Sequence, residues 1–242
     1  MNILTTLHSL IITYAIFTAY AFLNAFGSLY ADSFGPHLSL LIKSLLMLGI
    51  IPSACLALRK FLSIPRLRVR FIPTFMWTIL SLYPMLSLAA VHHICPKCVS
   101  LSNIDPVQLF QNAILPAISE EFFFTGVVVF YLKKYWSNRT VYGMLITLQL
   151  MAHSDTIALD HSKVTAVFAI LTFSWSQAAF ALHSGTYLPG VIAHFISNSV
   201  TLFAPLISNQ LFIRTVSSIV YGLFSVAFIT IGDYRLGRRR RQ

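Results

Sequence analysis

The chain has 242 residues, of which 57% are hydrophobic and only 10% are charged, and its mean hydropathy is +0.75. Soluble domains carry about 25% charged residues, so this composition excludes an ordinary soluble domain and predicts an integral membrane protein. A formal net charge of +10 would suggest a nucleic-acid partner in a soluble chain. Here the basic residues gather in short segments between apolar runs, so no nucleic-acid binding is expected.

Apolar runs long enough to cross a bilayer recur along the whole chain. A transmembrane helix needs about 20 mostly apolar residues, and the first four runs meet this length, with Gly27 expected to end the first of them. We therefore expect an all-α fold: a polytopic membrane helix bundle of about eight transmembrane helices, with the active site inside the bundle. Residues 1–242 would form a single integral-membrane domain. The predicted spans are 4–26, 38–58, 71–94, 107–132, 140–153, 164–183, 188–206 and 211–231.

The basic residues predict the orientation of these helices. Thirteen of the 17 Lys and Arg residues lie in three segments, 59–70, 133–139 and 232–242, which an eight-span bundle places on one side. Cytosolic segments of membrane proteins carry such an excess of Lys and Arg. Both termini are therefore expected in the cytosol, and the lipid bilayer is an expected partner.

The three cysteines predict no disulfide framework. Cys95 and Cys98 fall in a loop expected on the opposite side of the membrane, where they could be oxidised to a pair or belong to a plain loop. Together with His92 and His93 they look superficially like zinc ligands. Their spacing is too compressed for a regular structural zinc site, and no second pair of ligands follows.

The only two glutamates of the chain, Glu120 and Glu121, are adjacent and lie in the middle of a predicted span. No other charged residue occurs between Val107 and Leu132. An ionised carboxylate in hydrocarbon costs several kcal/mol or more, so it must find a partner, become neutral or face a wet cavity. Two carboxylates side by side are hard to explain by packing, and the pair is therefore a candidate functional site.

Polar residues on two later spans could meet these glutamates at a similar depth. His153 ends the fifth span, and His194 and Asn198 lie four residues apart on one face of the seventh. A carboxylate and an imidazole can take a proton from water as it attacks a carbonyl carbon. A second imidazole and an amide can donate hydrogen bonds to the developing oxyanion. None of these residues is a covalent nucleophile, so water attack on an amide is the natural reaction class.

Different roles for the same residues stay open at this point. His153 could be an ordinary helix-end histidine, and His194 with Asn198 could simply link helices by hydrogen bonds. Glu120 and His153 could also serve as a proton relay in a transporter. A zincin site is not expected because the sequence contains no H-E-x-x-H motif.

The order of three short motifs resembles the CAAX protease and bacteriocin-processing superfamily of intramembrane proteases. These motifs are Glu120-Glu121-x-x-x-Thr125-Gly126, Ala152-His153 and His194-x-x-x-Asn198. The sequence is most similar to the eukaryotic type II CAAX prenyl endopeptidase branch. The likeness covers 116–198, about a third of the chain, within an expected motif core of 107–207.

The resemblance implies an intramembrane endopeptidase that removes the last three residues of prenylated CaaX proteins, such as small GTPases, in the endoplasmic reticulum membrane. Glu120 and His153 would activate water, and His194 and Asn198 would stabilise the oxyanion. No cofactor is expected, although a divalent metal such as zinc could take part, because relatives have been called metalloproteases. Two competing functions are a proton-coupled membrane transporter and a catalytically inactive membrane scaffold of the same family.

Two positions depart from the family pattern. Thr125 stands where the first motif has arginine, and Gln149 stands where the second has phenylalanine. Thr125 lies one helical turn after Glu121, to which it can offer only a hydrogen bond. Gln149 lies one turn before His153 and could bond to it. Glu121, Thr125 and Gln149 are therefore expected to support the site rather than to act on the substrate.

Overall fold

The computed structural model describes residues 3–64, 71–98, 105–159, 163–202 and 207–239, and these ranges contain helices and no strand. This confirms the expected all-α fold. The elements are α1 (Ile3–Asp32), α2 (Pro36–Ser44), η1 (Leu45–Ile50), α3 (Ile51–Phe61), α4 (Phe71–Leu80), α5 (Pro84–Ile94), η2 (Pro96–Cys98), α6 (Pro106–Leu109), η3 (Phe110–Ile114), α7 (Leu115–Phe123), η4 (Phe124–Val129), α8 (Phe130–Lys133), α9 (Asn138–Ala152), α10 (Ser154–Leu159), α11 (Lys163–Ser184), α12 (Leu188–Leu202) and α13 (Ile207–Arg239).

Several of these elements join into longer rods. α2, η1 and α3 run on without a break, and so do α6, η3, α7, η4 and α8. Five stretches among the described residues are long and apolar enough to cross a membrane, which together with the helical content makes the chain a polytopic membrane helix bundle. These stretches are Ile3–Asp32, Pro36–Phe61, Thr74–Ile94, Pro106–Lys133 and Lys163–Ser184.

Helices α9 and α12 are shorter than a full membrane span. Each has 15 residues, which corresponds to about 22 Å, whereas the hydrocarbon core is about 30 Å thick. The candidate histidines belong to these two short helices: His153 caps the end of α9, and His194 lies in the middle of α12.

Prolines inside the long rods coincide with widened helical turns. η1 and η3 are π-helical, and Pro52 and Pro116 each lie two residues after the end of one of them. A proline within a helix removes one N–H donor and pushes against the preceding turn. A π-helical turn accommodates this without ending the helix, and such turns are frequent at functional sites. The rod that contains Glu120 and Glu121 therefore continues past Pro116.

The prediction that Gly27 ends the first helix is wrong, because α1 continues to Asp32. A Cβ atom on Gly27 would lie on the side chain of Leu46 from η1. The glycine therefore allows η1 to pack closely against α1 rather than terminating it. Just beyond this contact, Lys43 Nζ donates to Asp32 Oδ1 at 2.6 Å. Lys43, the charged residue within the second predicted span, is therefore paired with an acidic residue of α1.

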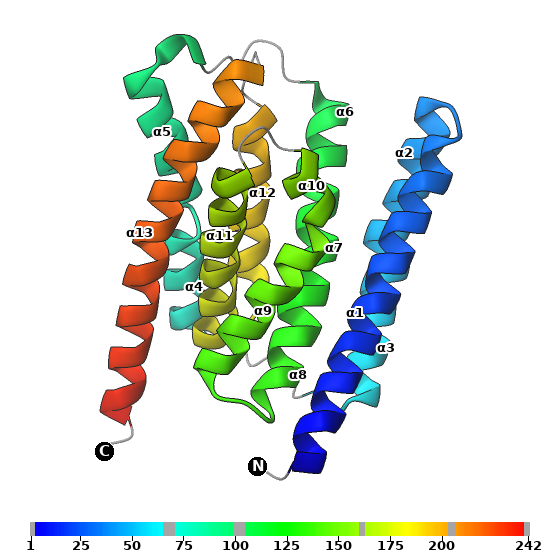
Figure 1. Ribbon diagram of the computed structural model, residues 1–242, viewed down its shortest axis with the longest axis vertical. Coiled ribbons are helices and arrows are strands. Elements are labelled where there is room, and N and C mark those ends of the chain that lie inside the picture. The colour runs from blue at the N-terminus through cyan, green and yellow to red at the C-terminus, as the bar shows by residue number, and fades with distance from the viewer. Residues whose placement is uncertain (1–2, 65–70, 99–104, 160–162, 203–206, 240–242) are drawn as a thin grey trace.

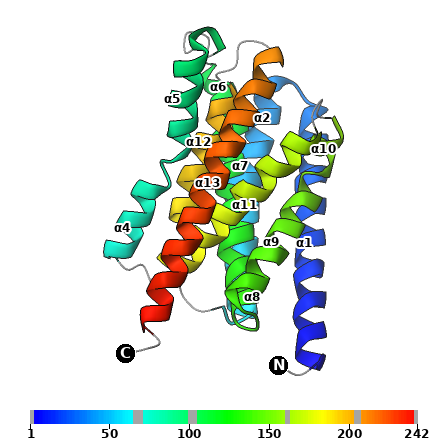
Figure 2. The same cartoon turned by 60° about the vertical axis from the view of Figure 1, so that its left-hand side comes forward.

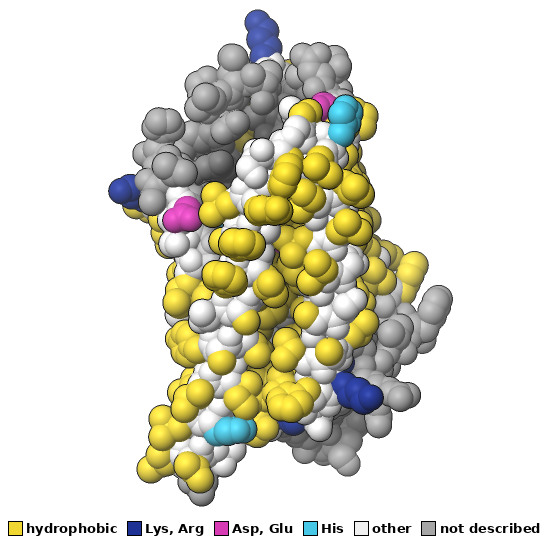
Figure 3. Space-filling view, turned by 90° about the vertical axis from the view of Figure 1, so that its right-hand side faces the viewer, with side chains coloured by type: hydrophobic (Ala, Val, Ile, Leu, Met, Phe, Trp, Pro, Cys, Tyr) yellow, Lys and Arg dark blue, Asp and Glu magenta, His cyan; other side chains and the backbone are white. Residues whose placement is uncertain are grey.

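The rods run side by side, and α1 begins at the end of the bundle where α3, α8 and α13 finish (Figures 1 and 2). Hydrophobic side chains cover the face on which α1 and the α2–α3 rod lie, and the charged side chains visible there sit near the two ends (Figure 3). Many large apolar side chains on these helices are exposed, including Leu4, Phe22 and Leu45. A face of this kind is suited to contact with lipid.

Helix α12 lies in the middle of the bundle and packs against α4, α5, α7, α11 and α13.

At the end of α5, Cys95 and Cys98 form a disulfide. Of the two possibilities considered for this loop, a plain loop or an oxidised pair, the structure therefore shows the oxidised pair. Predictions for the basic segment 65–70, for residues 203–206 of the seventh span and for residues 240–242 of the tail fall outside the described residues.

Candidate active site

The two glutamates lie on α7, between the π-helical segments η3 and η4. The side chain of Glu121 is completely buried and that of Glu120 is 14% exposed. Adjacent positions on a helix point about 100° apart, so the two carboxylates face different neighbours. A buried carboxylate needs partners, and the surrounding helices provide them.

Helix α12 provides the partner of Glu121. His194 Nδ1 lies 2.9 Å from Glu121 Oε1, which is a hydrogen bond between two buried side chains. The tight turn between α11 and α12 sets the start of this helix. Gly185 adopts a φ of 76°, which favours glycine, and the Ser184 hydroxyl accepts from the Thr186 N–H.

Glu120 faces both candidate histidines. Its Oε2 atom lies 3.8 Å from His153 Nε2 and 3.9 Å from His194 Nε2. These distances are too long for direct hydrogen bonds. Polar groups that lie beyond direct hydrogen-bond range can be bridged by one water molecule. The structure thus brings three sequence-predicted residues from α7, α9 and α12 together around one oxygen atom.

His153 is positioned by the end of α9. It is the C-cap residue, with φ −104° and ψ 19°, and its N–H donates to the Gln149 carbonyl at 3.0 Å. The residue lies between α9 and α10, and its side chain lines the cavity and faces Glu120. It remains about one-third exposed.

Asn198 lines the same cavity as both histidines. The cavity is about 200 Å³ and lies between α11, α12 and α13 near the end of α9. Hydroxyl groups also line it, and the Tyr221 hydroxyl donates to Ser197 at 2.9 Å. His153, His194 and Asn198 therefore surround one space, which is polar where the histidines and the amide meet it, and Glu120 faces the two histidines.

The predicted supporting residues contact the site through the backbone. The Thr125 hydroxyl donates to the Glu121 carbonyl at 2.7 Å, and Gln149 accepts from the His153 N–H through its own carbonyl. The carbonyl of Gly126 in η4 accepts from Arg59 of α3. A cation thus does approach this stretch, from another helix and beyond the position where the family has arginine.

Two residues that sequence reasoning missed lie where α11 and α12 pack near Glu121. Gln177 on α11 is fully buried, and a Cβ atom on Gly190 of α12 would come within 2.8 Å of Glu121 Oε2. A neutral amide in the middle of an apolar span was the available signal for Gln177. Gly190 gave no distinct signal because glycine near a helix start is ordinary.

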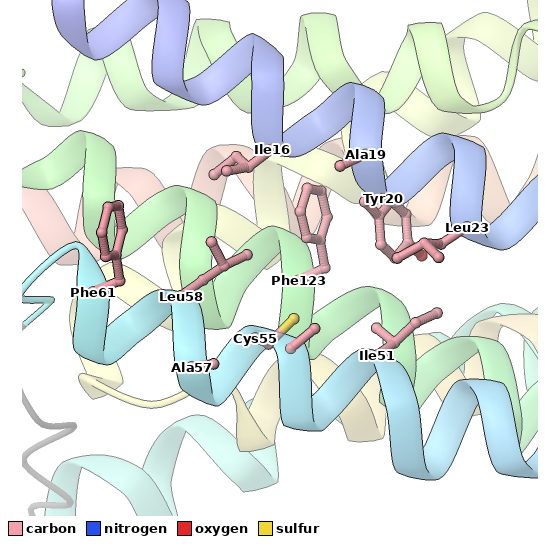
Figure 4. Close-up of a pocket in the computed structure, with 11 residues that line it drawn as sticks. Ile16, Ala19, Tyr20, Leu23, Ile51, Cys55, Ala57, Leu58, Phe61 and Phe123 are labelled. Atoms are coloured by element: carbon pink, nitrogen blue, oxygen red, sulfur yellow. The ribbon is translucent and has the colours of Figure 1, made fainter.

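A second cavity lies on the other side of α7, between α1 and α3 (Figure 4). It measures about 410 Å³ and its lining is almost entirely apolar, with Ile16, Leu58 and Phe61 on its walls. At its inner end the rings of Tyr20 and Phe123 stack at 4.0 Å. Phe123 belongs to α7, the helix that carries Glu120 and Glu121. The cavity therefore approaches the glutamate pair from the lipid-facing side.

The arrangement provides acid–base groups and hydrogen-bond donors around one space. Within the described residues, no three His, Cys, Asp or Glu side chains are placed to hold one metal ion. The expectation of no cofactor stays a prediction. Glu120 can exchange protons, while the amide of Asn198 and a protonated imidazole can donate.

Residues 102–200 match the family described as Type II CAAX prenyl endopeptidase Rce1-like. No curated protein and no solved structure gives a significant match to the chain. The matched range contains α7, α9, α11 and most of α12, and therefore both glutamates, both histidines and Asn198. Through this segment, which holds all of the candidate site residues, the chain is similar to the Rce1-like family of CAAX-type intramembrane proteases.

Proposed function

We propose that this protein is a prenyl-protein endopeptidase that removes the aaX tripeptide from prenylated CaaX proteins, using a water molecule activated by Glu120. The observation that carries the proposal is the position of Glu120 Oε2, which lies 3.8 Å from His153 Nε2 and 3.9 Å from His194 Nε2. The similarity of residues 102–200 to the Rce1-like family supports the substrate class.

In the first step, Glu120 takes a proton from a water molecule held beside His153. The water oxygen bonds to the carbonyl carbon of the peptide bond that follows the prenylated cysteine, and the carbonyl oxygen becomes an oxyanion. In the second step, the carbon–nitrogen bond breaks and Glu120 returns the proton to the leaving amine. The products are a prenylcysteine carboxylate and a free tripeptide, and no covalent enzyme intermediate forms.

His194 and Asn198 stabilise the oxyanion in this proposal. His194 donates through Nδ1 to Glu121, so only the protonated ring also carries a donor hydrogen on Nε2, the atom that faces Glu120. The buried Glu121 carboxylate is the counter-ion for that protonated ring, as a carboxylate is for the histidine of other hydrolases. Asn198 adds a neutral donor from the next turn of α12.

The apolar cavity between α1 and α3 suits the lipid part of such a substrate. Its volume of about 410 Å³ falls in the range of small-molecule pockets. A prenyl chain partitions into the bilayer, and the open face between α1 and α3 lets it enter sideways. Tyr20 and Phe123 would then place the modified cysteine near Glu120.

Cleavage of a defined peptide tests the proposal. Purified protein in detergent is given a farnesylated CaaX peptide and the same peptide without the farnesyl group, and release of the tripeptide is followed by mass spectrometry. We expect cleavage of the farnesylated peptide only. An inactive scaffold would release no tripeptide from either peptide. A proton-coupled transporter would also release none, and would instead respond to a pH gradient in vesicles.

A chelator separates the metal-free mechanism from the metal-dependent one. Because Glu120 and His153 can hold water between them without a metal ion, we propose a metal-free reaction, in which pre-incubation with a strong chelator leaves the rate unchanged. Loss of activity, and its recovery on adding zinc, would replace this proposal with a metal-bound water.

Narrowing the apolar cavity should weaken substrate binding. Ala19 of α1 lines the cavity (Figure 4), so Ala19→Trp fills space that the prenyl chain would use. Losing contact with two methylene groups corresponds to about 1.6 kcal/mol, or roughly a tenfold rise in KM, with kcat retained. Ala25→Trp is the matched control, because Ala25 is also exposed on α1 but does not line the cavity. An equal KM in the two variants would place the prenyl chain elsewhere.

We further propose the endoplasmic reticulum membrane as the location, with both termini in the cytosol, since prenylated CaaX proteins are cytosolic. Tags fused to the two ends should both be digested by protease added to sealed microsomes. The sequon at Asn138, which lies at the start of α9, should carry no glycan. Protection of either tag, or glycan at Asn138, would contradict this orientation.

A further inference from the structure

Gln177 is a buried amide for which the proposed reaction gives no role. It lies in the middle of α11, its side chain is fully buried, and neither Oε1 nor Nε2 has a hydrogen-bond partner. A polar group removed from water in this way is costly unless a partner is close. The position is therefore informative about what Gln177 faces.

Gln177 and the carboxylate of Glu121 approach the same point of α12. A Cβ atom built on Gly190 would lie 2.6 Å from Gln177 Oε1 and 2.8 Å from Glu121 Oε2, so both groups occupy the space that a side chain on Gly190 would need. Oε2 is also buried and without a hydrogen-bond partner, while Oε1 is bonded to His194. Unpaired polar atoms from α7 and α11 thus meet at a glycine of α12.

A half-turn of the Gln177 amide exchanges its oxygen and nitrogen positions at no steric cost. The exchange places the Nε2–H group beside the Gly190 Cβ position that Glu121 Oε2, which lacks a donor, also approaches. We propose that Gln177 is a positioning residue for Glu121: its amide donates to Oε2 while His194 donates to Oε1, and Gly190 is required because any side chain there would separate them.

The proposed hydrogen bond from Gln177 gives Glu121 a partner that the family arginine cannot supply here, because Thr125 stands in its place. The Thr125 hydroxyl donates to the backbone carbonyl of Glu121, and the Glu121 side chain is completely buried. A donor on each oxygen fixes the carboxylate plane, and with it the ring of His194. The inference rests on the proposed function, in which His194 Nε2 contacts the oxyanion.

The test compares Gln177→Met, which keeps the length of the side chain but removes the donor, with wild type in the peptide-cleavage assay. We expect kcat to fall about 100-fold, the loss typical of a reacting group displaced by about 1 Å, with KM within about twofold of wild type. Gln177→Met combined with Glu121→Gln should be no slower than Glu121→Gln alone, because Gln177 acts through Glu121. Additive losses would overturn the proposal.

Gly190→Ala is the second variant, because its Cβ would displace both groups without removing either, and it should also lower kcat. Gly222→Ala on α13 is the matched control: the nearest atom to its Cβ would be at 3.5 Å, an ordinary contact, so its activity should be unchanged. Thermal unfolding of all variants identifies those that are merely unstable. An active wild type with an equally active, folded Gln177→Met rejects this inference alone, whereas an inactive wild type rejects the proposed function.

Discussion

Replacing Glu120 by glutamine is expected to abolish tripeptide release. The variant keeps the size of the side chain and can still hold a water molecule, but it cannot take a proton from that water. General acid–base catalysis by one side chain contributes about 10²–10⁴-fold to a rate. Because Glu120 both removes the water proton and returns it to the leaving amine, we expect a loss at the upper end of this range. The loss should be in kcat, since Glu120 approaches the reacting atoms and not the prenyl chain.

Asp32→Asn is the matched control for Glu120→Gln. Asp32 is also a carboxylate of a membrane-spanning helix, and its neutralisation breaks an ion pair with Lys43. That pair lies at the end of α1 and Asp32 is largely exposed, so the loss of stability should be about 1 kcal/mol or less. Activity should remain within about twofold of wild type. A folded Glu120→Gln variant with full activity would remove Glu120 from the mechanism.

The ionisable residues of the predicted spans were enough to predict which side chains gather in the candidate active site. A carboxylate pair in an apolar run demands partners, and few groups in the other spans could serve as partners. The structure places His153 and His194 at 3.8 and 3.9 Å from Glu120, and Asn198 on the cavity that both histidines line. Long apolar runs likewise predicted the rods of the bundle, because helix length follows from the thickness of the bilayer.

Neutral residues carried too little signal for the remaining features. Gln177 is one amide among several polar residues in its span, and its approach to Gly190 becomes visible only when α11 lies against α12. Gly27 and Gly190 act through close approach of another helix, which no local pattern encodes. The division between the two glutamates also needed the fold. Sequence reasoning directed Glu120 toward both histidines, whereas Glu121 has the direct hydrogen bond to His194.

Glu121 and His194 should behave as a single unit when they are replaced. His194 Nδ1 and Glu121 Oε1 are 2.9 Å apart, and both side chains are buried, so removal of either leaves the other without its partner. We expect Glu121→Ala and His194→Ala each to lower kcat about 10²–10⁴-fold, and the double variant to be no slower than the worse single one. Cleavage rates of the four proteins, measured with saturating farnesylated peptide, give this comparison directly.

The double variant also distinguishes catalysis from stability. A single buried partner left behind is destabilising, whereas removal of both groups is less so. The double variant should therefore unfold at a higher temperature than the less stable of the two single variants while remaining inactive. If the two losses of kcat multiply instead, Glu121 and His194 act independently, and Glu121 is not the counter-ion of the protonated imidazole. The imidazole ring carries a hydrogen on both nitrogens only when it is protonated. Without that counter-ion, a neutral ring that keeps its hydrogen on Nδ1 offers the oxyanion no donor at Nε2, and stabilisation of the oxyanion would fall to Asn198.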